Sequence, residues 1–159
     1  MNKNLNFFNT LSNKKEKFEG RWNIASFEIK YLNQSEFEIK QNIKRDYLYY
    51  DFDPTRTEGA TPLPANNFYS YTDYEIAYST PDKNLFSVRS KVNFGDFFNG
   101  TKFSINSELN FRVQPYFNTS LKINYDSIEL PEPYPSRDIW LISPKLQFTF
   151  NKKTFWTTY

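Results

Sequence analysis

Hydrophobic and polar residues alternate along most of this chain, and the alternation is clearest in its central third. From Leu85 to Phe94, apolar residues occupy mainly the even positions, and polar or charged residues occupy the odd ones. After a segment from Gly95 to Gly100 the parity reverses, and apolar residues fall on odd positions as far as Val113. Successive side chains of a β-strand point to opposite faces, so each run predicts a strand with one apolar and one polar face. Together the two runs predict a long antiparallel hairpin.

The same period of two predicts strands on both sides of this hairpin. Parity slips near Ala25, which predicts a β-bulge in the first of them. Residues 1–17 are rich in Asn and Lys and predict a poorly ordered segment or a short strand. The predicted strands cover residues 18–32, 36–50, 68–78, 84–94, 101–113, 119–127, 138–150 and 154–159.

The connections between these strands alternate in length. The short ones are expected at 33–35, 80–83, 114–118 and 151–153, and the longer ones at 51–67, 95–100 and 128–137. In an up-and-down meander, successive connections lie at opposite ends of the sheet, and transmembrane barrels have tight turns at one end and longer loops at the other. The sequence therefore predicts an all-β antiparallel up-and-down meander of seven or eight long strands, in which residues 18–159 are a segment of a transmembrane β-barrel.

Composition narrows the classes of function. The chain has 159 residues, including 12 Tyr and 17 Phe, yet its mean hydropathy is −0.75. Large apolar groups dispersed among polar ones are typical of alternating strands. The absence of Cys and His excludes disulfides, thiolate chemistry, His-based metal sites and catalytic triads that use His. The net charge of +2 gives no indication of a nucleic-acid partner. We expect neither an enzyme nor a cofactor.

Segments that target proteins to membranes are also missing from the sequence. No run approaches the roughly 18 consecutive apolar residues of a transmembrane helix. The first ten residues lack the apolar stretch of a signal peptide, which an outer-membrane protein requires. Either the chain is a truncated part of a longer precursor, which we expect, or the membrane interpretation is wrong.

Periodicity alone leaves open which face meets water. In a membrane barrel the apolar face contacts lipid and the polar face lines the lumen, whereas in a soluble all-β binding module the aromatic residues face an internal core. Long strands, alternating connections and aromatic residues near strand ends, at 47–52, 68–71 and 94–98, favour the membrane interpretation. The expected lipid-facing residues are Phe37, Ile39, Ile43, Phe86, Val88, Val92, Phe103, Ile105, Leu109 and Phe111. The expected lumen-facing residues are Glu38, Lys40, Lys44, Arg89, Lys91, Glu108 and Arg112.

Basic and acidic residues are mixed on the expected polar face. The basic residues Arg45, Lys91 and Arg112 are assigned to it together with the acidic residues Glu38, Asp46 and Glu108. Such mixed rows predict ion pairs that fill or narrow a pore, so that the interior is either plugged or weakly selective for polar solutes.

Carboxylate pairs offer the only candidate hydrolytic chemistry. Glu36 and Glu38 share a face, as do Asp73 and Glu75. Because no other catalytic feature accompanies them, we interpret them as solvated or lumen-facing positions balanced by neighbouring basic residues such as Lys40.

Two binding chemistries have weaker support. Trp22, Trp140 and Trp156 could stack on sugar rings, but each lies in an alternating run, so packing in a core or a lipid belt is the preferred interpretation. Asp51–Asp53 near Glu58 could bind a cation through oxygen ligands, but this Pro-rich loop has no Gly-centred ligand motif, so a solvated loop is preferred.

Several motifs resemble the C-terminal part of the DUF5916 proteins of Bacteroidetes. They are the turn sequence of Gly95–Thr101, Pro115, the Glu129-Leu130-Pro131 strand end, Leu146–Phe150 and Thr154–Trp156. In that family a secreted module similar to family 9 carbohydrate-binding domains precedes a large predicted outer-membrane barrel, and no enzymatic activity is established. The resemblance covers roughly residues 18–159.

This resemblance implies a fragment of an outer-membrane β-barrel protein, with a structural or transport role at the cell envelope and a link to glycan handling. The expected partners are outer-membrane lipid, the remaining strands of a longer parent barrel, and a glycan. The alternative is a soluble all-β binding module with a glycan or protein ligand.

Overall fold

The computed structural model describes residues 6–9, 14–17, 20–113, 115–151 and 154–159, and every regular element among them is a β-strand. No described helix could cross a membrane. The strands are β1 Asn6–Asn9, β2 Lys14–Lys17, β3 Gly20–Lys30, β4 Glu36–Leu48, β5 Asn67–Ser79, β6 Phe86–Phe97, β7 Gly100–Val113, β8 Phe117–Glu129, β9 Arg137–Asn151 and β10 Thr154–Thr158.

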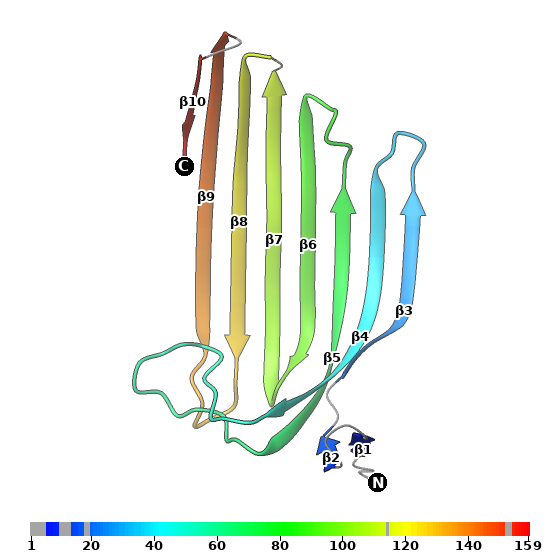
Figure 1. Cartoon of the computed structure of the whole chain (residues 1–159), viewed down its shortest axis with the longest axis vertical. Helices are drawn as coiled ribbons and strands as arrows, with labels where there is room; N and C mark the ends of the chain where they lie inside the picture. Colours follow the sequence, from blue (N-terminus) through cyan, green and yellow to red (C-terminus); the bar gives the residue numbers. More distant parts are fainter. Residues whose placement is uncertain (1–5, 10–13, 18–19, 114, 152–153) are drawn as a thin grey trace.

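Eight strands form one sheet in which each strand pairs antiparallel with its neighbours in sequence, from β3 to β10 (Figure 1). The predicted all-β up-and-down meander is therefore confirmed. The sheet is open, because β3 and β10 lie at its two edges and do not pair with each other. Strands β1 and β2 form a separate two-stranded sheet within the segment expected to be poorly ordered or a short strand; the rest of that segment lies outside the described residues.

Strand register follows the alternation that the sequence predicted. Phe86 faces Phe111 across the β6–β7 ladder, while Arg89 faces Glu108, so apolar and polar positions separate onto opposite faces. The register of β3 against β4 shifts between Asn23 and Ala25, which confirms the predicted bulge. Strands β3 to β9 have between 11 and 15 residues, longer than the usual five or six or so of a globular strand.

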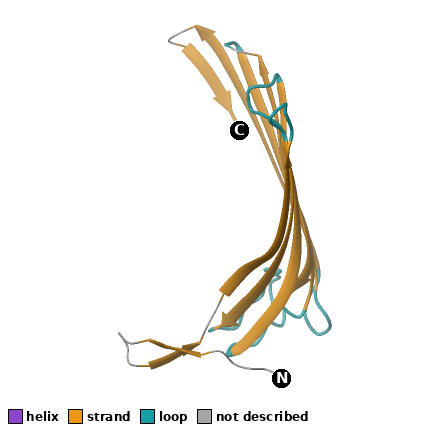
Figure 2. Cartoon of the chain, turned by 90° about the vertical axis from the view of Figure 1, so that its right-hand side faces the viewer, coloured by secondary structure: helices purple, strands orange, loops and turns teal. Residues whose placement is uncertain are grey.

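The sheet is a single curved layer, seen edge-on as a crescent in Figure 2. No described element covers the apolar face, where large side chains such as Phe86, Trp140 and Ile142 are more than half exposed. Few apolar side chains are buried in the part of the chain that the structure describes. They are Tyr47, Leu63, Tyr71, Ile128 and Leu130, and they come from or adjoin the connections at the lower end of Figure 1.

One predicted connection is wrong. The segment from Gly95 to Gly100 was expected to be a loop of medium length, but β6 continues to Phe97 and β7 begins at Gly100. Only Phe98 and Asn99 lie between the strands, and Phe98 has a φ of 52°. A positive φ is typical of two-residue hairpin turns, and here a Phe adopts it in place of the usual Gly, Asn or Asp. The reversal of parity that suggested a loop is produced by this tight turn.

The alternation in connection length is consequently only partial. The lower end carries the long connections 49–66 and 130–136 but also the two-residue turn 98–99. The upper end carries connections 31–35, 80–85 and 114–116, of which residue 114 lies outside the described part of the chain.

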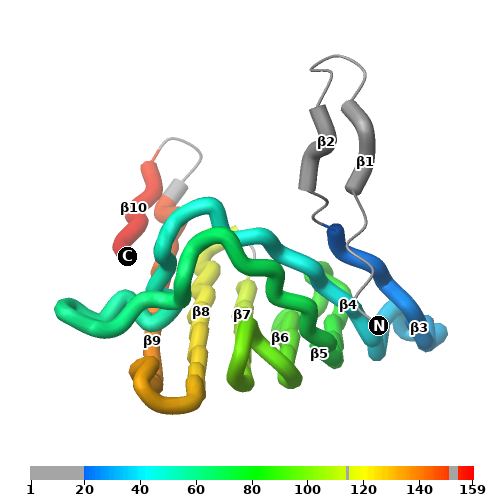
Figure 3. Tube along the Cα trace, turned by 90° about the horizontal axis from the view of Figure 1, so that it is seen from below, coloured from blue at the N-terminus to red at the C-terminus, as the bar shows by residue number. Residues whose placement is uncertain are grey.

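The connection between β4 and β5 is part of a larger arm, which we define as residues 46–72. Pairing of β3 with β4 ends at Gly20 and Arg45, and pairing of β5 with β6 ends at Asp73 and Gly95, whereas β4 and β5 stay paired with each other as far as Leu48. The arm leaves the sheet at these points and crosses its lower end towards β9, on the concave side (Figures 1, 2 and 3).

Gly95 marks the place where the arm departs. Its φ is +141°, and a Cβ atom there would lie 2.6 Å from the carbonyl oxygen of Thr72 and 2.8 Å from the Cα of Asp73. Both contacts are with backbone, so no side-chain rotation can relieve them. Glycine is therefore required for the close approach of β5 to β6 at the base of the arm.

We predict that Gly95→Ala destabilises the fold by about 3 kcal/mol, because it combines backbone strain with a steric clash. The matched control is Gly59→Ala, which also has a positive φ (+74°) but has no atom within 4 Å of its Cβ position; it should cost only about 1 kcal/mol. Urea unfolding followed by circular dichroism measures both. Equal effects of the two substitutions would show that the approach to Thr72 and Asp73 is unimportant.

Candidate functional site

The candidate site is the polar face of the sheet. By register, the seven residues expected to face a lumen lie on one face, and the ten expected to face lipid lie on the other. Arg45 was also assigned to the polar face, and that assignment is wrong. It lies opposite Ser70 on the same side as Ile43, and its guanidinium carbon is 4.5 Å from the centre of the Phe68 ring.

Ion pairs cross the strands in the middle of the polar face. The Lys40 ammonium lies 2.7 Å from a Glu38 carboxylate oxygen and 3.7 Å from Glu75, and Lys91 lies 3.2 Å from Glu75 on the other side. Lys40, Glu75 and Lys91 belong to β4, β5 and β6, so these contacts connect three consecutive strands. The other two carboxylates of the candidate hydrolytic pairs also contact a Lys: Glu36 lies 3.8 Å from Lys30, and Asp73 lies 2.8 Å from Lys44.

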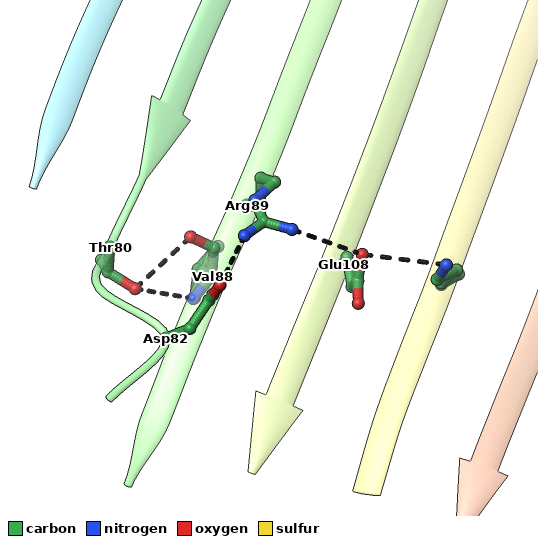
Figure 4. A network of polar contacts seen from close by, with 6 residues as sticks. Thr80, Asp82, Val88, Arg89 and Glu108 are labelled. Atoms are coloured by element: carbon green, nitrogen blue, oxygen red, sulfur yellow. Dashed lines mark hydrogen bonds and ion pairs between the residues drawn. The ribbon is translucent and has the colours of Figure 1, made fainter. Parts of the chain in front are cut away.

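A second network lies near the β5–β6 connection, at the end of the sheet that is uppermost in Figure 1, and is shown from close by in Figure 4. The Arg89 guanidinium lies 2.8 Å from the Asp82 carboxylate in the β5–β6 connection and 4.0 Å from Glu108 on β7, which in turn is 3.9 Å from Lys122 on β8. The Thr80 hydroxyl accepts a hydrogen bond from the backbone N–H of Val88 at 2.8 Å. This network attaches the connection to the polar face. Arg112 lies further up the same face, opposite Asn118.

Two further ion pairs lie on the polar face at the base of the arm. Lys44 is 2.8 Å from the carboxylate of buried Asp73, and Lys102 is 3.2 Å from Asp126, which also accepts a hydrogen bond from Ser104 at 2.5 Å. A pocket of about 340 Å³ lies between these groups and is also lined by Tyr71, Asn93, Asp96, Phe97 and Asn106. Its lining contains both Lys and Asp side chains, so it can contact either positively or negatively charged groups.

An aromatic cluster fastens the arm to this region, and the sequence had assigned its members to a membrane girdle. The Phe98 ring lies 5.6 Å from Phe52, 5.3 Å from Tyr69 and 5.7 Å from Tyr71, and Phe97 lies 6.0 Å from Tyr71. Tyr71 also donates a hydrogen bond to Asp46. These rings face the concave side rather than the apolar face. Their position depends on the tight turn at Phe98, which no periodic signal in the sequence reveals.

Asp53 organises the loop of the arm. Its carboxylate accepts hydrogen bonds from the Thr55 hydroxyl at 2.7 Å and from the N–H groups of Thr55 and Thr57 at 2.8 Å and 2.7 Å. Partial burial opposes ionisation of Asp53, but these donors outweigh it and lower its pKa below the ordinary value. Asp51 likewise accepts a hydrogen bond from the N–H of Ala65 at 2.8 Å. Both carboxylates considered as cation ligands therefore bind the loop itself, and the described residues contain no cluster suited to a metal ion.

Two rows of aromatic side chains cross the apolar face. The lower row runs from β5 to β9, with ring centres 5.6 Å apart for Tyr74 and Phe94 and 4.3 Å for Tyr125 and Trp140. The upper row runs from β6 to β10, with 4.8 Å between Phe117 and Phe148 and 5.6 Å between Phe148 and Trp156. The lower row comprises Tyr74, Phe94, Phe103, Tyr125 and Trp140, and the upper row comprises Phe86, Phe111, Phe117, Phe148 and Trp156.

Each of the strands β6 to β9 contributes one ring to each row, and the two rings are always eight positions apart, as in Phe103 and Phe111. Between the rows lie mostly aliphatic residues, including Val92 opposite Ile105 and Val88 opposite Leu109. Trp140 and Trp156 thus belong to these rows, while Trp22 lies opposite Ile43 near the sheet edge. The recurrence of this spacing is present in the sequence, but only strand register aligns the rings into rows.

Comparison with known proteins identifies no relative. No model of a protein family, no curated protein and no solved structure matches the chain.

We predict that Asp73→Ala destabilises the fold by about 2–3 kcal/mol, because it removes a shielded ion pair and leaves the Lys44 charge without its carboxylate. The control is Asp82→Ala, whose ion pair with Arg89 has the same length of 2.8 Å. Side-chain exposure is 27% and 10% in the Lys44–Asp73 pair but 56% and 61% in the Arg89–Asp82 pair. The control should cost less than about 1 kcal/mol. Urea unfolding of both variants measures the two changes in the free energy of unfolding. A larger destabilisation by Asp82→Ala would refute the prediction that the shielded pair contributes more.

We also predict that the loop around Asp53 opens in acid. Because the pKa of Asp53 is lowered on folding, its contribution to stability is present above the unfolded value of about 3.9 and is lost as pH falls through the lower folded value. Amide hydrogen exchange at Thr55 and Thr57, corrected for intrinsic rates, should accelerate only in that range. Asp53→Ala should accelerate it about 10-fold at neutral pH, while Glu58→Ala, in the same loop, should not. Unchanged protection in Asp53→Ala would contradict this role.

Proposed function

We propose that this chain forms part of the wall of a transmembrane β-barrel in an outer membrane, with a structural or transport role at the cell envelope. In this proposal the apolar face contacts lipid, and the polar face surrounds a water-containing interior. The free edges of β3 and β10 then pair with further strands, because exposed backbone donors and acceptors are not tolerated in hydrocarbon.

The spacing of the two aromatic rows is the observation that carries the proposal. Eight residues of strand span about 27 Å, which is about 21 Å along the membrane normal for a strand tilted by about 40°. The aliphatic band between the rows, together with the rings themselves, therefore fits the apolar belt of about 25 Å, flanked by aromatic girdles, of outer-membrane barrels. A soluble protein has no comparable reason to place rings at the same interval on four consecutive strands.

Hydroxyl groups within the band support the same proposal. Ser90 and Ser107 lie directly opposite each other between the two rows, and their hydroxyl oxygens are 2.8 Å apart in a mutual hydrogen bond. In water each hydroxyl would readily bond to solvent, but in hydrocarbon an unpaired hydroxyl is costly. Cross-strand pairing makes both hydroxyls compatible with lipid.

The polar face supports an interior that is narrow rather than wide. Its ion pairs connect β4 to β8 side by side, and mixed charges in such rows restrict passage to small polar solutes. The resemblance to the DUF5916 barrels agrees with this location and adds a glycan as a further partner.

The alternative is a soluble all-β binding module. It requires a second layer over the apolar face to form an internal core, and no described element supplies one. A partner or a second copy would then have to cover that face, so the behaviour of the protein in water separates the two functions.

We predict that the fluorescence of Trp140 is quenched by lipid. A variant with Trp22→Phe and Trp156→Phe retains Trp140 as its one Trp, and it should refold into vesicles of phosphatidylcholine brominated along the acyl chain. Bromine near the headgroup should quench more strongly than bromine near the bilayer centre, because the aromatic rows lie at the edges of the apolar band. A parallel variant that retains Trp156 tests the upper row. A monodisperse protein in detergent-free buffer, with no quenching at either depth, would favour the soluble module.

A further inference from the structure

The arm covers the polar face at one end of the sheet. Its loop passes over β7, β8 and β9, so that Phe52 reaches the turn at Phe98 and Thr55 reaches β9 (Figure 3). Arg137 and Ile128 face each other in the β8–β9 ladder, on the same side as Lys102. The arm therefore lies against the face that carries the ion pairs and not against the apolar face.

Arg137 makes the contact that holds the tip of the arm to β9. Its Nη1 donates hydrogen bonds to the carbonyl oxygen of Thr55 at 3.1 Å and to that of Arg56 at 2.8 Å. These partners are 82 and 81 residues away in sequence. Thr55 is fully buried, so the loop is in close contact at this point. A guanidinium is suited to the task, because it donates several hydrogen bonds in a fixed plane and stays charged at any relevant pH.

The space left beneath the arm is small. A pocket of about 510 Å³ lies between the loop and the sheet, and it is lined by Phe52, Arg56, Lys102, Asp126 and Arg137, among others. Phe52 and Phe97 line this space, and both rings pack against Phe98 in the turn between β6 and β7. Such a volume is of the order of a small-molecule site rather than an open channel.

We propose that the arm is a constriction of the barrel interior that Arg137 latches in place. While the latch is made, the lower end of the polar face admits only small solutes. When it is released, the arm swings about its attachment at Gly95 and Arg45 and widens the passage. This inference rests on the proposed function for the passage of solutes, whereas the latch itself is a property of the folded chain.

The latch is tested by trypsin cleavage after Arg56 in the refolded full chain. The Arg56 side chain is exposed but its carbonyl is held by Arg137, so cleavage requires the arm to open. Arg137→Ala should raise the rate of cleavage at Arg56 by about 10- to 100-fold, without raising cleavage at Arg89 or Lys102 within the sheet. Arg137→Lys, which keeps a charged donor, should give an intermediate rate.

Arg112→Ala is the matched control. Arg112 is an exposed Arg on the same face of the sheet, but it lies at the opposite end, near Asn118. Cleavage at Arg56 should be unchanged in this variant. Equal rates for wild type, Arg137→Ala and Arg137→Lys would overturn the latch. If Arg137→Ala fails to fold, cleavage spreads over the whole chain, and Arg137→Lys then decides the outcome.

Conductance in a planar bilayer, measured on the longer barrel that supplies the strands pairing with β3 and β10, tests the constriction separately. Arg137→Ala should show a larger conductance than wild type and Arg112→Ala. If the arm opens in the protease assay but conductance is unchanged, the arm is not a constriction and this inference fails while the barrel proposal stands. If none of the three proteins inserts into the bilayer, the barrel proposal fails and the constriction fails with it, whereas the protease assay still decides whether Arg137 holds the arm.

Discussion

Hydrogen bonding between neighbouring strands holds this molecule together. The sheet is one layer thick, and its strands pair in the order of the sequence, so each strand depends on the two beside it. In most β proteins a second layer adds a hydrophobic core to this ladder. Here buried apolar side chains are restricted to a few positions around the arm. The hydrogen-bonded ladder therefore determines the shape of the sheet, and both faces of the sheet remain available for contacts with other molecules.

The two faces differ in a way that is unusual for a soluble protein. Polar residues such as Asp73, Ser87 and Ser104 are buried, whereas Phe86, Trp140 and Phe150 are more than half exposed. The polar side chains bond to one another across strands, and the pairs of Asp73 and Asp126 near the arm are the more shielded ones. The apolar side chains form continuous aromatic and aliphatic rows, and an exposed apolar surface of this kind is typical of a site that contacts a partner or a membrane. Burial, ion pairing and ring spacing all support the orientation that we propose for the two faces.

Local backbone rules are broken where the arm meets the sheet. Gly95 allows β5 to approach β6 closely before the two strands separate, and Phe98 adopts a positive φ that places its ring beneath the arm. Residues held in rarely populated conformations persist only when their surroundings compensate for the strain. At Phe98 the compensation comes from four aromatic neighbours, and three of these, Phe52, Tyr69 and Tyr71, belong to the arm. Strain and packing coincide at the one part of the chain that crosses the sheet.

The sequence by itself determined the strands, their meander and the composition of each face, because side-chain direction in a strand repeats every two residues. It also located the bulge near Ala25, since a slip in parity is local information. It misread the turn at Phe98 as a longer loop, because parity cannot distinguish a loop from a tight turn. It also misread Arg45 as a polar-face residue, because its charge suggested that face although its odd position places it on the side of Ile43. The ion pairs followed from residue type, but their pairing required the register. The arm, the rings around Phe98 and the contact of Arg137 with Thr55 and Arg56 were decided only by the tertiary structure, since they join residues far apart in the chain that no periodic pattern relates.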